Sequence, residues 1–129
     1  MPGDRTRTVA NDGVRLHVRE WPGGGDDVLL IHGLASSSHI WDLVAPRLVR
    51  LGLHPVAYDQ RGHGRSSKPS SGYGFDETTA EVVTVSISRS PDRHGSRLLG
   101  IVAAICALGV TAGIIRAIVT YRATRTSRT

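Results

Sequence analysis

Two short segments of this sequence combine residue types that could do chemistry. In the first, His32, Gly33 and Leu34 follow four consecutive branched apolar residues at positions 28–31. A glycine directly after a buried strand lets the backbone turn so that N–H groups point into a cleft. The tetrahedral oxyanion of an acyl transfer needs such pre-organised N–H donors, each worth a few kcal/mol at the transition state. The segment therefore suits oxyanion stabilisation, with an ordinary strand-to-helix turn as the alternative.

The second segment, residues 59–67, reads Asp-Gln-Arg-Gly-His-Gly-Arg-Ser-Ser and follows a short apolar run. Gly62 and Gly64 permit tight turns, and Asp59 and Arg61 can pair or bond loop carbonyls. The spacing of the glycines does not fit a phosphate-binding loop, because no Gly-Lys-Ser or Gly-Lys-Thr follows them. Ser66 does not stand in a Gly-x-Ser-x-Gly context. We therefore predict that this segment is scaffold.

The elements around these segments predict an α/β fold. Residues 14–21 alternate apolar and polar side chains after an Asn-Asp-Gly turn, which is typical of a half-buried strand. The run at 28–31 predicts a fully buried strand, and residues 55–58 predict another. Between them, residues 40–51 have helical spacing, with Pro46 near the first position of the helix and Gly52 closing it. A loop leads into a second helix at 76–83. Strands that alternate with helices predict a parallel sheet.

The two segments, about 25 residues apart and each placed directly after a strand, resemble the N-terminal part of the α/β-hydrolase fold family. The resemblance covers roughly residues 8–83. It implies that the Leu34 N–H is an oxyanion donor and that His32 and Gly33 shape its turn. It also implies a structural role for the second segment, namely for Asp59, Arg61, Gly62, His63, Gly64 and Ser66. The implied parent activity is serine-type hydrolysis of an ester, amide or related bond in a small molecule, without metal or organic cofactor.

The nucleophile of such an enzyme is missing from the sequence. The family needs a nucleophile on a sharp strand-to-helix elbow, followed along the chain by an acid and a histidine. The one pair of glycines four apart that qualifies, Gly109 and Gly113, has Thr111 at its centre, and no His, Asp or Glu follows. A β-branched residue tolerates the strained elbow poorly. We therefore expect a truncated or frame-shifted hydrolase, inactive alone, whose frame shifts or stops soon after Val83. A non-enzymatic, membrane-tethered interaction protein and a partner chain that supplies the triad are the alternatives.

The net charge of +5 belongs to the last third of the chain. Residues 1–83 hold nine Lys and Arg against ten Asp and Glu, whereas residues 84–129 hold seven Arg and one Asp. We expect a polar linker at 84–97 (with a strand at 84–88), an unrelated apolar helix at 98–121 and a basic tail at 122–129. Tyr121 is the one aromatic residue there, so a base-stacking platform for specific nucleic-acid binding is not expected. The single Cys106 excludes an intramolecular disulfide.

The 18 residues from Leu98 to Ile115 carry no charge and, as a helix, would be close to the length that spans a bilayer. Residues 1–12 have no apolar core flanked by basic residues, so a secretory signal is not visible. We expect the cytoplasm, with a single-pass membrane protein as the alternative. If the strand that leads to the nucleophile is absent, residues 28–31 become an exposed apolar edge. Such an edge predicts self-association.

Overall fold

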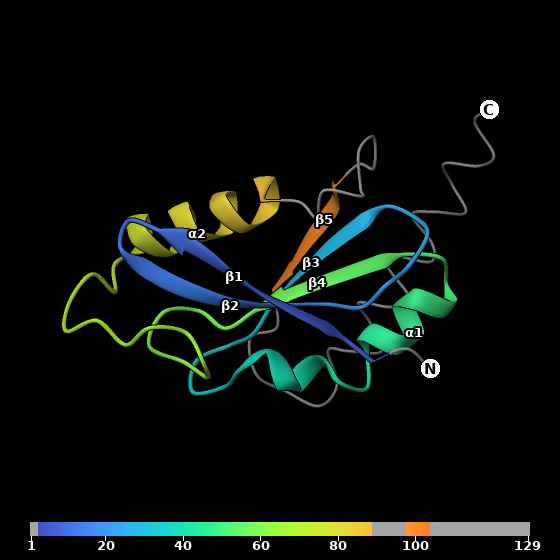
Figure 1. Cartoon of the computed structure of the whole chain (residues 1–129), viewed down its shortest axis with the longest axis horizontal. Helices are drawn as coiled ribbons and strands as arrows, with labels where there is room; N and C mark the ends of the chain where they lie inside the picture. Colours follow the sequence, from blue (N-terminus) through green and yellow to red (C-terminus); the bar gives the residue numbers. More distant parts are fainter. Residues whose placement is uncertain (1–2, 89–97, 104–129) are drawn as a thin grey trace.

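A computed structural model describes residues 3–88 and the backbone of residues 98–103. These residues form a five-stranded sheet with strand order β1-β2-β4-β3-β5. Figure 1 shows helix α2 on one face of the sheet and α1, with a short 3₁₀ helix, on the other. In chain order the elements are β1 (Arg5–Asn11), β2 (Val14–Glu20), β3 (Asp27–Ile31), the 3₁₀ helix (Ser38–Trp41), α1 (Ala45–Arg50), β4 (His54–Tyr58), α2 (Phe75–Ile87) and β5 (Leu98–Ala103).

The first two strands form an antiparallel hairpin, of which the sequence predicts only the second strand. Asn11 pairs with Val14, so Asp12 and Gly13 make a two-residue turn. Both turn residues have positive φ, 47° and 77°. That backbone is the one that matches the twist of paired strands, and it explains the Asp-Gly sequence. The hairpin then joins the sheet through antiparallel pairing of β2 with β4.

The parallel part of the sheet confirms the predicted alternation of strands and helices. β3 pairs in parallel with β4, from Asp27 opposite His54 to Ile31 opposite Tyr58. Pro46 stands at the start of α1, and Gly52, with a φ of 75°, follows its end. These positions agree with the helix start and stop expected from the sequence.

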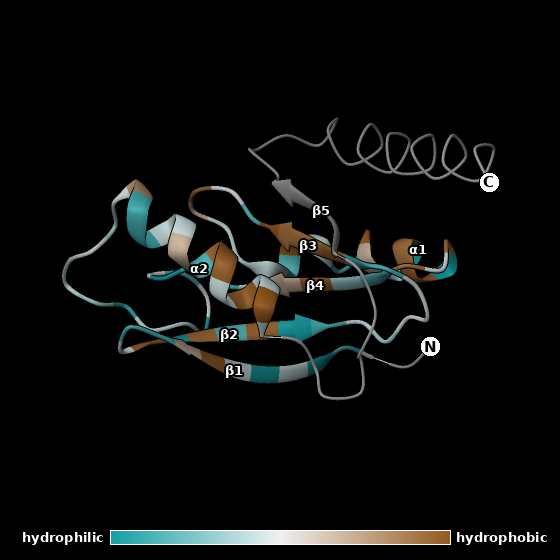
Figure 2. Ribbon diagram, turned by 90° about the horizontal axis from the view of Figure 1, so that it is seen from above, coloured by the Kyte–Doolittle hydropathy of each residue, from teal (hydrophilic) through white to brown (hydrophobic). Residues whose placement is uncertain are grey.

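Strand β3 is buried on both faces, as the apolar run at 28–31 predicts, and the apolar part of the strand is brown in Figure 2. Val28 and Leu30 face α1, and Leu29 faces the α2 side. The core therefore has two layers. The α1 layer holds Trp21, Val28, Leu30, Trp41, Val44, Ala45, Leu48, Leu53 and Ala57. The α2 layer holds Val9, Val14, Leu16, Val18, Leu29, Tyr58 and Val85.

The strand predicted at 84–88 is wrong, because residues 84–87 continue α2 and Ser88 caps its end. Val85 is buried at 3% exposure whereas Ile87 is 74% exposed, so the alternating residues do not share one face. Thr84 Oγ1 donates to Asn11 Oδ1 at 3.0 Å and fixes the helix to the hairpin. The boundary that the sequence suggests after Val83 thus falls inside a helix.

The apolar segment that begins at Leu98 starts as a strand and not as the predicted helix. β5 (Leu98–Ala103) pairs in parallel with β3, and Ala103 lies opposite Ile31. Strand β3 is therefore an inner strand, and the exposed edge expected at 28–31 is covered by backbone hydrogen bonds from β5. A six-residue apolar run cannot be assigned to strand or helix by periodicity alone, which explains the error.

The rest of the expected helix, residues 104–121, and the basic tail at 122–129 lie outside the described residues. Most of the polar linker, residues 89–97, also lies outside them. Among the helices that the structure does describe, none is long and apolar enough to span a membrane. Membrane contact through residues 104–115 stays a prediction.

Candidate functional site

The two chemistry-bearing segments meet at one edge of the sheet. β3 and β4 are parallel and in register, and Ile31 lies opposite Tyr58. The residues that follow these two strands, His32 and Asp59, therefore leave the sheet side by side. Loops after the carboxyl ends of parallel strands are where α/β proteins place their sites.

His32 is buried, at 2% exposure, and both of its ring nitrogens are bonded. Its Nε2 accepts a hydrogen bond from the backbone N–H of Gln60 at 3.0 Å. Its Nδ1 lies 2.7 Å from the carbonyl oxygen of Gly33. Because a carbonyl only accepts, Nδ1 must carry the proton and His32 is neutral. Burial lowers the pKa of His32, and the bond to Gly33 opposes this effect only in part.

Leu34 stands two residues after this anchored histidine, and the residue is 84% exposed. Within the described part of the chain, its backbone N–H has no hydrogen-bond acceptor. The next residue, Ala35, has a φ of 56°, which a residue with a side chain rarely adopts. Backbone strain of this kind concentrates at functional sites. The geometry thus leaves a free N–H donor on a strained turn, where the sequence predicts an oxyanion donor.

Asp59 connects the two segments through its carboxylate. Its Oδ1 accepts from the Ser38 N–H at 2.7 Å, and its Oδ2 accepts from the Arg65 N–H at 3.0 Å. Burial alone would raise the pKa of Asp59, but these N–H donors outweigh it and hold the pKa below its usual value. Asp59 therefore stays ionised and ties the turn after β3 to the loop after β4.

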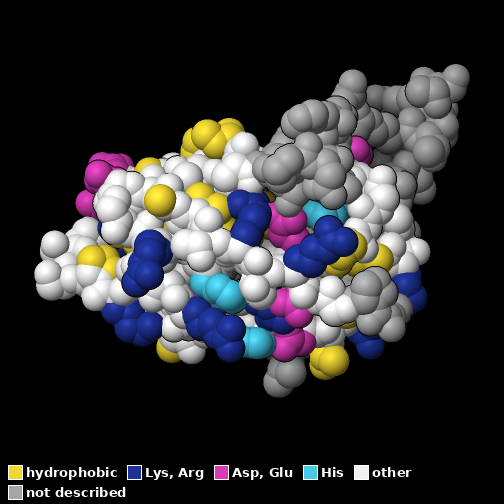
Figure 3. Space-filling view, in the orientation of Figure 1, with side chains coloured by type: hydrophobic (Ala, Val, Ile, Leu, Met, Phe, Trp, Pro, Cys, Tyr) yellow, Lys and Arg dark blue, Asp and Glu magenta, His cyan; other side chains and the backbone are white. Residues whose placement is uncertain are grey.

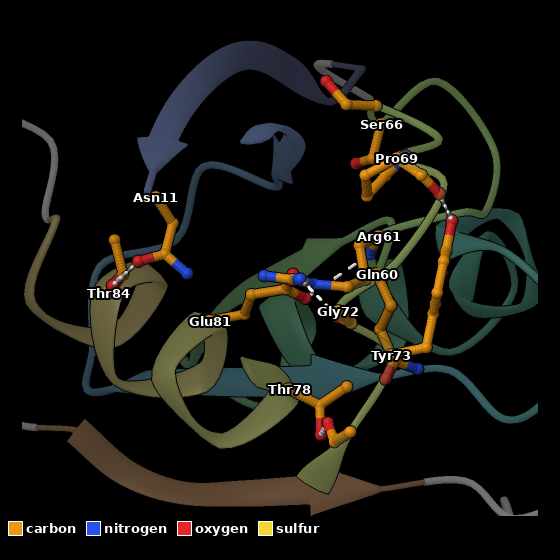
Figure 4. Close-up of polar contacts among 12 residues, drawn as sticks. Asn11, Gln60, Arg61, Ser66, Pro69, Gly72, Tyr73, Thr78, Glu81 and Thr84 are labelled. Atoms are coloured by element: carbon orange, nitrogen blue, oxygen red, sulfur yellow. Dashed lines mark hydrogen bonds and ion pairs between the residues drawn. The ribbon is translucent and has the colours of Figure 1, made fainter. Parts of the chain in front are cut away.

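Arg61 and Glu81 form a buried ion pair under the second segment (Figure 4). Arg61 Nε donates to the Glu81 carboxylate, which is fully buried on α2, and another guanidinium nitrogen donates to the carbonyl of Gly72. The Arg61 backbone N–H also faces Glu81, at 3.4 Å. The pair therefore fixes the 59–67 loop both to α2 and to the chain that leads into it.

The two serines of this segment anchor it to strand β2. Ser66 Oγ accepts from the His17 N–H at 2.9 Å and donates to the carbonyl of Asp59. Ser67 Oγ accepts from the Arg15 N–H at 3.0 Å. Both hydroxyls thus serve as hydrogen-bonded anchors, in keeping with the predicted scaffold role.

Gly62 and Gly64 both have positive φ, 78° and 49°. A Cβ at Gly64 would clash with the carboxylate of Asp59, and one at Gly62 would lie 2.6 Å from the Tyr73 ring. His63, between them, places Nδ1 3.0 Å from the carbonyl of Arg61, and its ring lies 5.0 Å from that of His32. The structure thus brings together all the residues that the sequence selects in this loop.

Three partners in this arrangement are not among the residues that the sequence selects. Gln60 holds His32 from two sides, Glu81 pairs with Arg61, and Ser38 binds Asp59. Glu81 is the one with a usable signal, because it precedes buried Val85 by four residues and so shares its helix face. Gln60 acts through its backbone N–H as well as its side-chain amide, and no residue type reveals the backbone contact.

A second polar cluster lies on the α1 side of the sheet. Arg19 bonds Asp4 Oδ2 and Asp42 Oδ1, each at 2.7 Å, and stacks 4.7 Å from the ring centre of Trp21. These residues line a hollow of about 350 Å³ together with Gly3, Pro22, Pro46 and Val49. None of the lining residues belongs to either segment described above.

Basic and acidic side chains are interspersed on the face shown in Figure 3. This distribution fits the near-neutral charge of residues 1–83, and the described surface seen there has no continuous basic patch.

Acid titration tests the role of Asp59. Since its folded pKa lies below the ordinary value of 3.8, the stabilisation that it provides is complete above that value and is lost as pH falls through the folded pKa. We expect Asp59→Asn to flatten the decline of melting temperature between about pH 5 and pH 2. The parent chain, titrated under the same conditions, is the reference. Parallel curves for Asp59→Asn and the parent would contradict this assignment.

The comparisons with known proteins agree with this geometry. A profile of the alpha/beta hydrolase fold matches residues 27–100. A non-heme haloperoxidase from Rhodococcus erythropolis is 36% identical over 77 residues, which cover 60% of this chain and 28% of that protein. Epoxide hydrolase A from Mycobacterium tuberculosis is 37% identical over 86 residues, covering 64% and 27%.

Solved structures give the same result. An epoxide hydrolase from Vigna radiata superposes with a TM-score of 0.67 at 29% identity, covering 79% of this chain and 32% of that one. A thioesterase domain from the curacin biosynthetic pathway has a TM-score of 0.67 at 26% identity, covering 79% and 35%.

An antiparallel hairpin joined to the parallel strands β4, β3 and β5, with a strained turn after β3, matches the N-terminal part of an α/β-hydrolase sheet. The chain belongs to the alpha/beta hydrolase fold family. It spans less than a third of the length of each of the two curated relatives above.

Proposed function

We propose that residues 3–88 provide the oxyanion-hole side of a serine-type hydrolase that acts on an ester, amide or related bond of a small molecule. The observation that carries the proposal is the Leu34 N–H, which lacks an acceptor among the described residues and stands on a strained turn fixed by His32. A donor aimed at the developing oxyanion must be held in place before the reaction. The bonds from His32, Gln60 and Asp59 supply that fixation.

We further propose that the 129-residue chain does not catalyse this reaction by itself. β5 lies beside β3, and the family places its nucleophile on the elbow just after a strand. The sequence after Ala103 contains no Gly-x-Ser-x-Gly, and Thr111 stands eight positions beyond the end of the strand. Nucleophile, acid and histidine would therefore have to come from residues other than these 129. Cofactors are not needed for such a reaction, since acid–base and nucleophilic groups suffice.

A change of reading frame is one origin of such a chain. The family match runs to residue 100, which supports a frame change beyond that point, later than the position expected from the sequence. Translation of the surrounding nucleotide sequence in the other two frames should then reveal Gly-x-Ser-x-Gly within a few tens of residues. The absence of the motif in all three frames would remove this origin.

The donor role of Leu34 is tested in a chimera. Residues 1–88 replace the matching segment of the Rhodococcus erythropolis haloperoxidase, and hydrolysis of p-nitrophenyl acetate is measured. We expect Leu34→Pro, which removes the N–H, to lower kcat by about 10²–10³-fold. Leu34→Ala retains the N–H and should stay within a few-fold, because the side chain is exposed.

Two controls accompany this measurement. The 129-residue chain alone should give no hydrolysis above buffer, and turnover by it would refute the proposed inactivity. Circular dichroism establishes that both Leu34 variants of the chimera are folded. Equal kcat for folded Leu34→Pro and Leu34→Ala would show that this N–H does not stabilise the oxyanion.

A further inference from the structure

The peptide between Gly33 and Leu34 is held from its carbonyl side. His32 Nδ1 donates to the Gly33 oxygen at 2.7 Å. A peptide unit is planar and, in this chain, trans throughout the described residues. Its C=O and N–H bonds therefore point in opposite directions. A hydrogen bond that fixes the Gly33 carbonyl thus also fixes the direction of the Leu34 N–H.

The histidine ring is in turn held by Gln60. The Gln60 backbone N–H donates to His32 Nε2 at 3.0 Å, and the Gln60 side-chain amide donates to the His32 carbonyl at 2.6 Å. The ring is buried, so water does not compete for these bonds. The arrangement needs Nδ1 as donor and Nε2 as acceptor, which only the neutral imidazole provides.

We propose that His32 and Gln60 form a proton-sensitive clamp that aims the Leu34 N–H while His32 is neutral and releases it when His32 is protonated. The inference rests on the proposed function, since it concerns the same donor, and it adds a regulation of that donor by pH. Protonation places a second N–H on the ring, at Nε2, where the Gln60 N–H already points. Two donors then face each other at Nε2. The Nδ1–H donor to Gly33 survives protonation, so the release comes from displacement of the ring away from the Gln60 N–H.

The groups that face His32 come from the loop after β4. Besides Gln60, these are His63, whose ring lies 5.0 Å away, and Asp59. Burial lowers the pKa of His32, the Gly33 carbonyl and Asp59 raise it, and His63 lowers it, with a net fall below the ordinary value of 6.5. The clamp is therefore closed at neutral pH and opens on acidification. Since the unfolded chain binds this proton first, stability also declines as pH falls below that value.

Nitrogen-15 NMR of the complete chain tests the clamp. At pH 7 we expect His32 to show a protonated Nδ1 and an unprotonated Nε2. The order parameter of the Leu34 amide should be about 0.85 at neutral pH, which is typical of rigid backbone. It should fall below about 0.6, which is typical of flexible backbone, as His32 becomes protonated. A protonated Nε2 at pH 7, or a Leu34 order parameter unchanged across the His32 titration, would overturn the proposal.

Two variants give the matched comparison. His32→Phe removes the bond to Gly33, so Leu34 should be flexible at every pH. His63→Phe preserves a ring beside His32 without touching the clamp, and Leu34 should stay rigid at neutral pH. Should His32→Phe not fold, the titration of the parent chain still decides the question.

The failure of this inference is distinguishable from failure of the proposed function, because the NMR readout needs no hydrolysis. If the order parameter of the Leu34 amide does not change when His32 titrates, the clamp is refuted and the donor role is not affected. If the kcat of the chimera does not change on Leu34→Pro, the donor role is refuted and the clamp is not affected.

Discussion

Replacement of Arg61 by methionine is expected to lower the free energy of unfolding by about 3–5 kcal/mol, the cost of breaking a buried ion pair on one side. The Glu81 carboxylate is fully buried on α2, and Arg61 supplies its cation. Methionine fills similar space but leaves that negative charge without a counter-ion. Urea unfolding at pH 7, followed by circular dichroism, measures the loss.

Arg65→Met is the matched control, because Arg65 stands four positions later in the same loop and is exposed. Its hydrogen bond to Asp59 uses the backbone N–H, which methionine retains. We expect a change within about ±0.5 kcal/mol, as for other surface substitutions. Equal losses for the two variants would show that the ion pair contributes nothing specific.

The double variant Arg61→Met with Glu81→Leu separates the lost attraction from the buried charge. Replacement of both partners by apolar residues is often neutral or stabilising. We therefore expect the double variant to recover most of the stability lost in Arg61→Met. A double variant as unstable as the single one would contradict this account.

The parts of the fold that the sequence predicts are those whose signal is local. The unbroken apolar run of β3 indicates burial on both faces, and the structure confirms it with core layers on both sides. Likewise Pro46 and Gly52 mark the ends of α1, because proline fixes φ at the start of a helix and glycine permits the positive φ that follows its end. Such signals do not depend on what the rest of the chain does.

The errors come from segments whose state is decided by distant contacts. Residues 84–88 alternate as a strand would, yet Val85 packs on the core and Ser88 ends a helix. Leu98 begins an apolar run that either element could use, and pairing with β3 selects the strand. Tertiary contacts override local preference in both cases, through helix packing in the first and strand pairing in the second.

The site shows the same division. His32, Leu34 and Asp59 could be selected because their positions relative to strands carry chemical meaning. Gln60 could not, since the contact of its backbone N–H with the His32 ring depends on the fold, as do the contacts of its side-chain amide with the His32 carbonyl and Nδ1. Glu81 acts through its side-chain carboxylate and is also missed, because its partner Arg61 stands 20 positions away in the sequence. Sequence reasoning therefore finds groups whose place directly after a strand carries meaning and misses groups whose role depends on a partner that only the fold brings close.

Gly64→Ala is expected to be the most disruptive small substitution in the loop. The Gly64 φ of 49° costs a residue with a side chain about 1–2 kcal/mol. The new Cβ would also clash with the Asp59 carboxylate, so the carboxylate or the loop must move, and overpacking of this kind costs about 1–3 kcal/mol. We expect a total loss of about 2–5 kcal/mol in urea unfolding at pH 7.

Alanine substitutions at two other glycines separate the backbone cost from the cost of the clash. Gly13, with a φ of 77°, has open space within 4 Å of the position that an alanine methyl would take, so Gly13→Ala should show the backbone cost alone. Gly24 has open space and no left-handed φ, so Gly24→Ala should be close to neutral. If the clash with Asp59 matters, the loss of unfolding free energy must rise from Gly24→Ala through Gly13→Ala to Gly64→Ala.

Because the Asp59 carboxylate also accepts from the Ser38 N–H, its displacement in Gly64→Ala should in addition shift the Ser38 amide resonance. A loss for Gly64→Ala no larger than that for Gly13→Ala would mean that the loop yields freely, and Asp59 would then not be the rigid tie between the two segments.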